Sequence, residues 1–146
     1  MAAAWVYFDA SALVKRYITE PGTTVVQRLL RRREIVTSAL TPVELASVFL
    51  RRRRAGELSQ ARFEALLRQL QSDRGHWTLV EASAPVLERA ESLLQGFVPI
   101  GLWDAIQVAS SVTFQAAVGI QVPLVTASVP QRDAALQRGV ETIWVG

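Results

Sequence analysis

Three acidic residues occupy positions where a carboxylate can do chemistry. Asp9 directly follows an apolar run over residues 4–8 that is typical of a buried strand. Glu44 lies one turn into a predicted helix, and Asp104 begins another. Because open α/β sheets place their sites at the carboxyl ends of strands, these side chains can converge there. Carboxylates held together bind hard cations, so Mg²⁺ or Mn²⁺ is the natural candidate to activate water against a phosphodiester.

Two of these acids also have a purely structural interpretation. Asp is a good helix N-cap, so Asp9 can begin the helix that follows it. Thr41, Pro42 and Glu44 together predict a helix start, with Thr as the N-cap, Pro at the first helical position and Glu completing a capping box. The structural and chemical roles can coexist, because a carboxylate offers more than one lone pair.

Asp104 is harder to explain by structure alone. Its helix carries no other charge, and an acid near a helix N-terminus is favoured by the dipole. Yet Asp104 shares a face with Gln107, Ser111 and Gln115, which makes a polar stripe on a helix that otherwise looks buried. The stripe favours a site role.

The tryptophans are predicted to lie in the core, although Trp103 adjoins Asp104.

The counts of cysteine and histidine exclude several kinds of chemistry. The 146 residues include no cysteine, which excludes disulfide scaffolds, zinc fingers and thiol catalysis. With one histidine, Ser-His-Asp hydrolysis would depend wholly on His76, and a soft metal has little to hold it. His76 lies in a predicted loop, where a surface or capping role is favoured.

The basic residues are concentrated in one segment. The net charge is +3, but residues 28–54 hold eight arginines and two glutamates, a local charge of +6. Such a segment can attract nucleic acid, although cations are also favourable at helix C-termini. Arg51 follows Glu44 by seven residues, on the same helix face about 10 Å along the axis, and is our choice for a phosphate contact. The arginines at 52–54 point elsewhere and are predicted to be solvated.

Hydrophobic periodicity predicts alternating strands and helices. The predicted strands cover residues 4–8, 35–37, 77–80, 123–126 and 142–145. The predicted helices cover about 12–17, 23–33, 41–56, 59–70, 84–95, 102–118 and 131–138. This alternation predicts a three-layer α/β/α sandwich around a mainly parallel sheet of four to five strands. With no repeat or linker in sight, we expect a single domain over residues 1–146.

Two stretches bear on location. Residues 105–131 carry no charge, but the polar residues among them predict a buried helix and strand rather than a membrane span. Residues 1–4 carry no basic side chain and do not read as a secretory signal, so a cytoplasmic location is expected.

Four segments, taken in order, carry a family resemblance. They are VYFDASALVK at residues 6–15, TPVELA at 41–46, DAIQVA at 104–109, and LVTAS at 124–128 followed by Gly139-Val140. Each motif is short, but their order and spacing over essentially the whole chain resemble the PIN-domain nucleases. Within that family the sequence most resembles the VapC-type toxins of VapBC toxin–antitoxin pairs.

The resemblance implies a function and a set of site residues. It implies an endoribonuclease that depends on Mg²⁺ or Mn²⁺, pairs with an antitoxin protein and forms a homodimer. Asp9, Glu44 and Asp104 match the metal-binding acids of the family. Ser11 and Thr126 match small hydroxyl residues near that site.

One position departs from the family pattern. The family usually has a fourth acid two residues after the threonine of its last motif, where this sequence has Ser128. Ser128 with Gln131 also predicts a capping box around Pro130, although a hydroxyl can still hold a metal-bound water. Asp133 follows five residues later and is predicted to face solvent.

Two other functions stay open at this point. A phosphatase of the haloacid-dehalogenase type would also use an Asp after the first strand, but it needs a second Asp at the position of Ser11. A PIN module that binds RNA or an antitoxin without cleaving RNA is the other alternative, and Ser128 is the feature that supports it.

Overall fold

The computed structural model describes residues 5–146, and its centre is a five-stranded sheet in which every strand is parallel to its neighbours. The strand order is β3-β2-β1-β4-β5. The strands are β1 (Trp5–Phe8), β2 (Glu34–Ser38), β3 (Thr78–Val80), β4 (Leu124–Thr126) and β5 (Thr142–Trp144). The predicted parallel α/β/α sandwich is therefore confirmed, with five strands rather than four.

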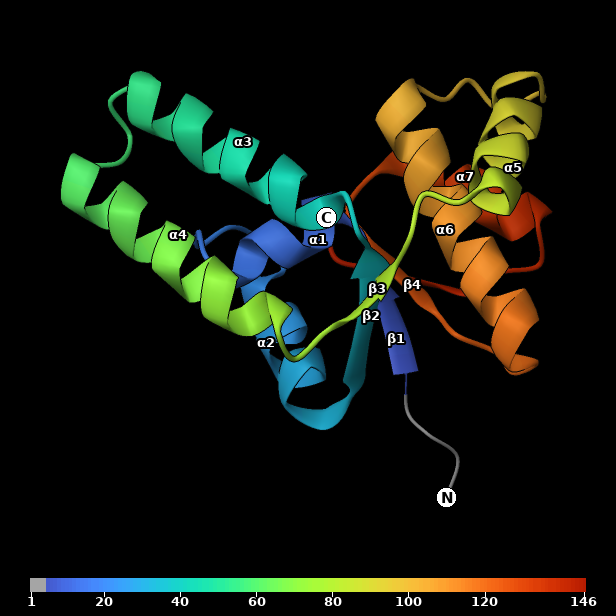
Figure 1. Ribbon diagram of the computed structural model, residues 1–146, viewed down its shortest axis with the longest axis horizontal. Coiled ribbons are helices and arrows are strands. Elements are labelled where there is room, and N and C mark those ends of the chain that lie inside the picture. Colours follow the sequence, from blue (N-terminus) through green and yellow to red (C-terminus); the bar gives the residue numbers. More distant parts are fainter. Residues whose placement is uncertain (1–4) are drawn as a thin grey trace.

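Helices cover both faces of the sheet (Figure 1). One layer holds α1 (Ala10–Leu13), the 3₁₀ turn η1 (Val14–Arg16), α2 (Thr23–Arg32), α3 (Thr41–Arg54) and α4 (Gln60–Arg74). The other layer holds α5 (Ala84–Leu94), α6 (Leu102–Val118) and α7 (Val129–Gln137). In Figure 1 the α3–α4 hairpin extends away from the sheet on one side, and α5 and α6 stand together on the other.

The alternation of side chains along β1 separates the two hydrophobic cores. Val6 and Phe8 pack with the α1–α4 layer, whereas Tyr7 faces the α5–α7 layer. All three side chains are buried, as expected for the central strand of a parallel sheet. The first strand was predicted to start at residue 4, which lies outside the described residues.

The strand order creates a topological switch point at β1. The chain leaves β1 for β2 on one side, and β4 later pairs on the other side. A crevice at the carboxyl ends of strands is the usual ligand site at such a point. Asp9 follows β1 and Thr126 ends β4, so the fold sets these two side chains next to each other there.

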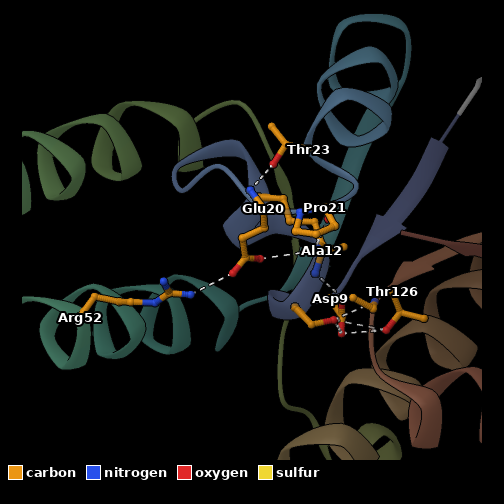
Figure 2. Close-up of polar contacts among 10 residues, drawn as sticks. Asp9, Ala12, Glu20, Pro21, Thr23, Arg52 and Thr126 are labelled. Atoms are coloured by element: carbon orange, nitrogen blue, oxygen red, sulfur yellow. Dashed lines mark hydrogen bonds and ion pairs between the residues drawn. The ribbon is translucent and has the colours of Figure 1, made fainter. Parts of the chain in front are cut away.

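An ion-pair network joins the first turns of the chain to α3 (Figure 2). The buried Lys15 ammonium donates to the carbonyl oxygen of Pro21 at 2.7 Å and pairs with Glu20 at 3.3 Å. Arg52 reaches the other oxygen of Glu20 at 2.9 Å. Arg53 donates to the side chain of Gln60 at 2.8 Å.

This network corrects the prediction for the arginines that follow Arg51. Arg52 and Arg53 are half-buried and bound, because Glu20 in the loop before α2 and Gln60 in the neighbouring α4 are partners that spacing along one helix does not reveal. Arg54 is exposed as predicted.

The uncharged stretch forms α6 and β4, as the sequence predicted. Within residues 5–146, no helix has the length and apolar character needed to cross a bilayer.

Gly22 gives a test of the packing between α2 and β5. It precedes α2 with a φ of 92°, in the left-handed region, and a Cβ added there would collide with the carbonyl oxygen of Val145. Gly56 has a φ of 78°, but the space that a Cβ would occupy there is open. Gly56→Ala should cost about 1 kcal/mol from backbone strain alone, and Gly22→Ala about 3 kcal/mol or more. Urea unfolding measures the free energy of unfolding of both variants. Equal losses of stability would contradict the close approach of Gly22 to the Val145 carbonyl.

Candidate active site

Asp9 lies fully buried at the switch point, with a relative exposure of 0%. Its Oδ1 accepts a 2.8 Å hydrogen bond from the backbone N–H of Ala12, so it is the N-cap of α1 as its structural interpretation predicted. Its Oδ2 accepts from the hydroxyls of Ser11 at 2.6 Å and Thr126 at 3.0 Å. Figure 2 shows Asp9 and Thr126 facing each other across this contact. The structural role is therefore confirmed, and the other oxygen of the same carboxylate faces the Ser11 and Thr126 hydroxyls.

No cation compensates this buried charge among residues 5–146. The ion pairs found there involve Glu20, Glu57, Asp73 and Asp133, but none of the three predicted site acids. Burial, and to a smaller extent the nearby charge of Asp104, raises the pKa of Asp9 to about 6 against the lowering effect of its hydrogen bonds.

Glu44 is held by an amide instead of by a capping box. The Nε2 group of Gln107 donates to Oε1 of Glu44 at 2.8 Å and to the hydroxyl of Thr41 at 3.0 Å. The hydroxyl of Tyr7 donates to the other end of Gln107 at 2.7 Å, which fixes the amide. Partial burial raises the pKa of Glu44, and the charges of Asp9 and then Asp104 add to the rise.

The capping box predicted at Thr41 and Glu44 is therefore wrong. Thr41 is already the first helical residue of α3, and Leu40 is the N-cap. The reason is tertiary: the Thr41 hydroxyl is buried, where Thr37 donates to it at 2.7 Å and Gln107 approaches from α6.

Asp104 is held by a second amide, that of Gln131. The Nε2 group of Gln131 donates to Oδ1 of Asp104 at 2.7 Å, and its Oε1 lies 3.4 Å from the Thr126 hydroxyl. Gln131 is only 3% exposed. A run of contacts thus joins Asp104 to Asp9 through Gln131 and Thr126.

Gln131 is the site residue that sequence reasoning missed. Ser128 does cap α7, because its Oγ accepts from the backbone N–H of Gln131 at 3.4 Å, and the helix starts at Val129, two residues earlier than predicted. In the predicted capping box the Gln131 side chain would accept from the backbone N–H of Ser128. It does not, because that side chain reaches Asp104 instead. A glutamine within an apolar helix face was the available signal, as it was for Gln107.

The other predicted residues have mixed outcomes. The Ser11 hydroxyl accepts from the backbone N–H of Ala127 at 2.9 Å, so it joins the β1 and β4 ends. Asp133 is half-exposed and pairs with Arg132. His76 is exposed, and its ring nitrogen Nδ1 lies 3.2 Å from the carbonyl oxygen of Ser72, which agrees with a surface role. Gln115 bonds the backbone N–H of Val122, away from the acids.

The three acids share one edge of the sheet without forming a closed cluster. The charge of Asp104 contributes to the raised pKa of Asp9 and of Glu44, yet within residues 5–146 no three acid, histidine or cysteine side chains are close enough to ligate one ion together. The donor set still suits a hard cation. Mg²⁺ usually keeps several waters and takes only one or two carboxylates directly, so oxygen donors at this spacing fit it.

A pocket of about 260 Å³ adjoins Glu44. Arg51 and Trp103 both line it, so the predicted phosphate contact lies on the same surface as one of the acids. Trp103 is 55% exposed. The prediction of a core position is therefore wrong for this tryptophan, and it is also wrong for Trp144, which is exposed as well.

Comparisons with known proteins agree with this architecture. The sequence profile of the PIN domain matches residues 6–120. A VapBC-family toxin–antitoxin structure from Mycobacterium tuberculosis, VapBC-5, is similar at 16% identity over 97% of this chain and 99% of that chain, with a TM-score of 0.65. FitAcB from Neisseria gonorrhoeae is similar at 15% identity over 94% and 96%, with a TM-score of 0.67. VapBC2 from Rickettsia felis, bound to a promoter DNA fragment, is similar at 14% identity over 95% and 97%, with a TM-score of 0.66. At these identities the likeness establishes the fold, and no curated protein sequence matches the chain.

The raised pKa of Asp9 predicts a pH-dependent loss of stability in buffer free of divalent cations. The folded pKa of about 6 exceeds the unfolded value near 3.9, so the folded state binds more protons between these values. The free energy of unfolding should therefore fall as pH rises from about 4 to 6 and stay lower above that, by about 3 kcal/mol.

Asp9→Asn should remove that loss, since its oxygen can still cap α1 and its amide carries no charge. Urea unfolding at pH 4.5 and 7.5 measures both forms. If Asp9→Asn retains the full fall in stability, Asp9 is not its source.

Proposed function

We propose, from the premise that the chain belongs to the PIN-domain family, that it is a metal-dependent endoribonuclease and the toxin of a toxin–antitoxin pair. The observation that carries the proposal is the buried Asp9 carboxylate, which has no cationic partner among residues 5–146 and lies beside two further acids. An acid kept in that state costs stability unless a bound cation compensates it.

Asp9, Asp104 and Glu44 are the residues that would hold a Mg²⁺ or Mn²⁺ ion, directly or through water. When bound, such an ion lowers the pKa of water and neutralises charge on an attacked phosphodiester. The three carboxylates support this choice, because they form no ion pair among residues 5–146 and hard divalent cations prefer carboxylate oxygens.

The protein's own part is to hold these acids in fixed positions. Ser11 and Thr126 orient Asp9, Gln107 orients Glu44, and Gln131 orients Asp104. All four donors are neutral, so they fix the carboxylates without cancelling the charge that attracts a cation. Partners of this kind around a metal site are typically worth about 10- to 100-fold in affinity or activity.

The partners follow from the proposal and from the relatives. The solved structures with this fold include toxin–antitoxin complexes from Klebsiella pneumoniae and Mycobacterium tuberculosis. An antitoxin partner, a homodimer and a cytoplasmic location are proposed for this chain on that basis. The 99% exposure of Phe97 supports a protein partner, since large apolar side chains in full contact with water favour burial in an interface.

Two alternatives are weaker. A haloacid-dehalogenase-type phosphatase lacks its second acid, because Ser11 stands there and serves as a donor to Asp9. A PIN module that binds without cleaving is favoured only by Ser128, whose side chain caps α7. Cleavage assays decide between it and the nuclease.

Asp104→Asn tests the proposed role in cleavage. The variant keeps an oxygen for Gln131 and loses only the charge. Cleavage of a mixed RNA pool in Mg²⁺ or Mn²⁺ should fall by roughly 100-fold or more, since even indirect partners of a metal are worth up to about that factor. The melting temperature without metal should hold or rise, because repulsion with Asp9 and Glu44 is relieved.

Asp133→Asn is the matched control, because Asp133 is a half-exposed carboxylate paired with Arg132. It should cleave as the parent does, and RNA binding should survive in both variants. Full cleavage by Asp104→Asn would remove Asp104 from the site. No cleavage by the parent would favour the binding module.

Ser128→Asp tests the departure from the family pattern. Asp also caps helices, so α7 should form as before, and the added anion should tighten Mn²⁺ binding by about tenfold. Ser128→Asn is the control, because it caps without charge. Titration calorimetry compares the three forms, and equal affinity of the Asp and Ser forms would leave Ser128 as a helix cap only.

A further inference from the structure

The pocket beside Glu44 lies between α3 and the first turn of α6. Leu40, Val43 and Val48 give it apolar walls, Trp103 lies on one side, and Arg51 is at its far end from Glu44 along α3. Val43 is 68% exposed and Trp103 is 55% exposed, so these apolar surfaces face water. Nothing in the packing of the core requires them there.

We propose that this pocket takes one unpaired nucleobase of the RNA, stacked on the Trp103 indole, with the adjoining phosphate on the Arg51 guanidinium. The inference rests on the proposed function, since RNA is the ligand of both. It goes further by naming a subsite for one base and the side chains that form it.

The chemistry of the walls fits a base. A nucleobase is flat, has an apolar face and polar edges, and stacks on aromatic side chains in most single-strand binding proteins. A volume of about 260 Å³ lies just below the range of pockets for drug-sized ligands, which suits one base. A paired base cannot enter such a pocket, because its face is already stacked within the duplex.

Arg51 is the arginine of α3 suited to the phosphate. It is exposed, and among residues 5–146 it forms no ion pair, whereas Arg52 is held by Glu20 and Glu57. A free guanidinium binds phosphate well because its planar donors match the oxygens.

The charges along α3 determine which phosphate of the bound RNA lies at the acids and which lies at Arg51. Glu44 is in the first turn and Arg51 is in the last, about 10 Å apart along the axis. A phosphate at the acid end requires a cation, whereas a phosphate at the Arg51 end does not. The cleaved phosphate therefore lies at the acids, and the next one lies at Arg51 with its base between them.

Equilibrium binding without divalent cations tests this inference. Fluorescence anisotropy measures the affinity of a labelled single-stranded RNA of mixed sequence and of an abasic ribose-phosphate oligomer of equal length. Trp103→Leu should weaken binding of the RNA by about 5- to 150-fold, the range for one stacked base. It should leave binding of the abasic oligomer unchanged. Trp103→Phe should restore most of the loss.

Two further variants serve as controls. Arg51→Gln should weaken binding of both oligomers and reduce the slope of log affinity against log salt by about 0.7, as for one phosphate contact on a single strand. Leu102→Ala removes a neighbouring exposed apolar side chain that does not line the pocket, and should change neither affinity.

Four results would overturn the inference. Equal weakening of both oligomers by Trp103→Leu would show that Trp103 does not contact a base. If Trp103→Leu leaves RNA binding unchanged but changes the oligomeric state measured by sedimentation, the pocket belongs to a protein interface. RNA bound and cleaved by the parent with no effect of Trp103→Leu would refute the pocket alone, whereas a parent that neither binds nor cleaves RNA would refute the proposed function as well.

Discussion

The arrangement of the site depends on one constraint, the burial of the Asp9 carboxylate at the switch point of the sheet. A buried charge is costly unless it is hydrogen-bonded or paired, and Asp9 has three donors but no cation among the described residues. Each donor comes from a feature that the fold already needs. Ala12 belongs to the first turn of α1, Ser11 also bonds the backbone after β4, and Thr126 ends β4. The carboxylate is thus fixed by the same contacts that close the sheet edge.

The acids are held by amides and hydroxyls, and the charged partners lie elsewhere. Arg16 pairs with Asp73, and Lys15 and Arg52 pair with Glu20, all within the α1–α4 layer. An arginine beside Asp9 would lower its pKa and stabilise the empty site, but it would also compete with a bound cation. Neutral donors such as Gln107 and Gln131 hold the carboxylates in position without competing with a cation. The cost is a raised pKa of Glu44, which burial causes first and repulsion from Asp9 and Asp104 increases.

Sequence reasoning predicted what local pattern and strand order determine. The parallel sandwich, the placement of Asp9 after β1 and the burial of α6 all follow from apolar runs and their alternation. It failed where a side chain chooses a distant partner over a local one. Thr41 bonds Thr37 and Gln107 instead of capping α3, and Gln131 reaches Asp104 instead of completing its box. Local capping rules count only neighbours in sequence, whereas a buried polar group takes the partner that tertiary packing brings closest.

The charges that stabilise α3 are also the charges that the proposed ligand would contact. An acid in the first turn and arginines in the last turn both complement the helix dipole, so Glu44 and Arg51 stabilise α3 where they stand. The same order gives the pocket a negative end at Glu44 and a positive end at Arg51, about 10 Å away along α3. The charge pattern of α3, which in the sequence looks like ordinary helix capping, therefore also gives the two ends of the pocket opposite charge. On the proposed function, a strand of RNA laid along this surface would meet a cation-dependent end at the acids and a cation-independent end at Arg51, and only the first would carry cleavage.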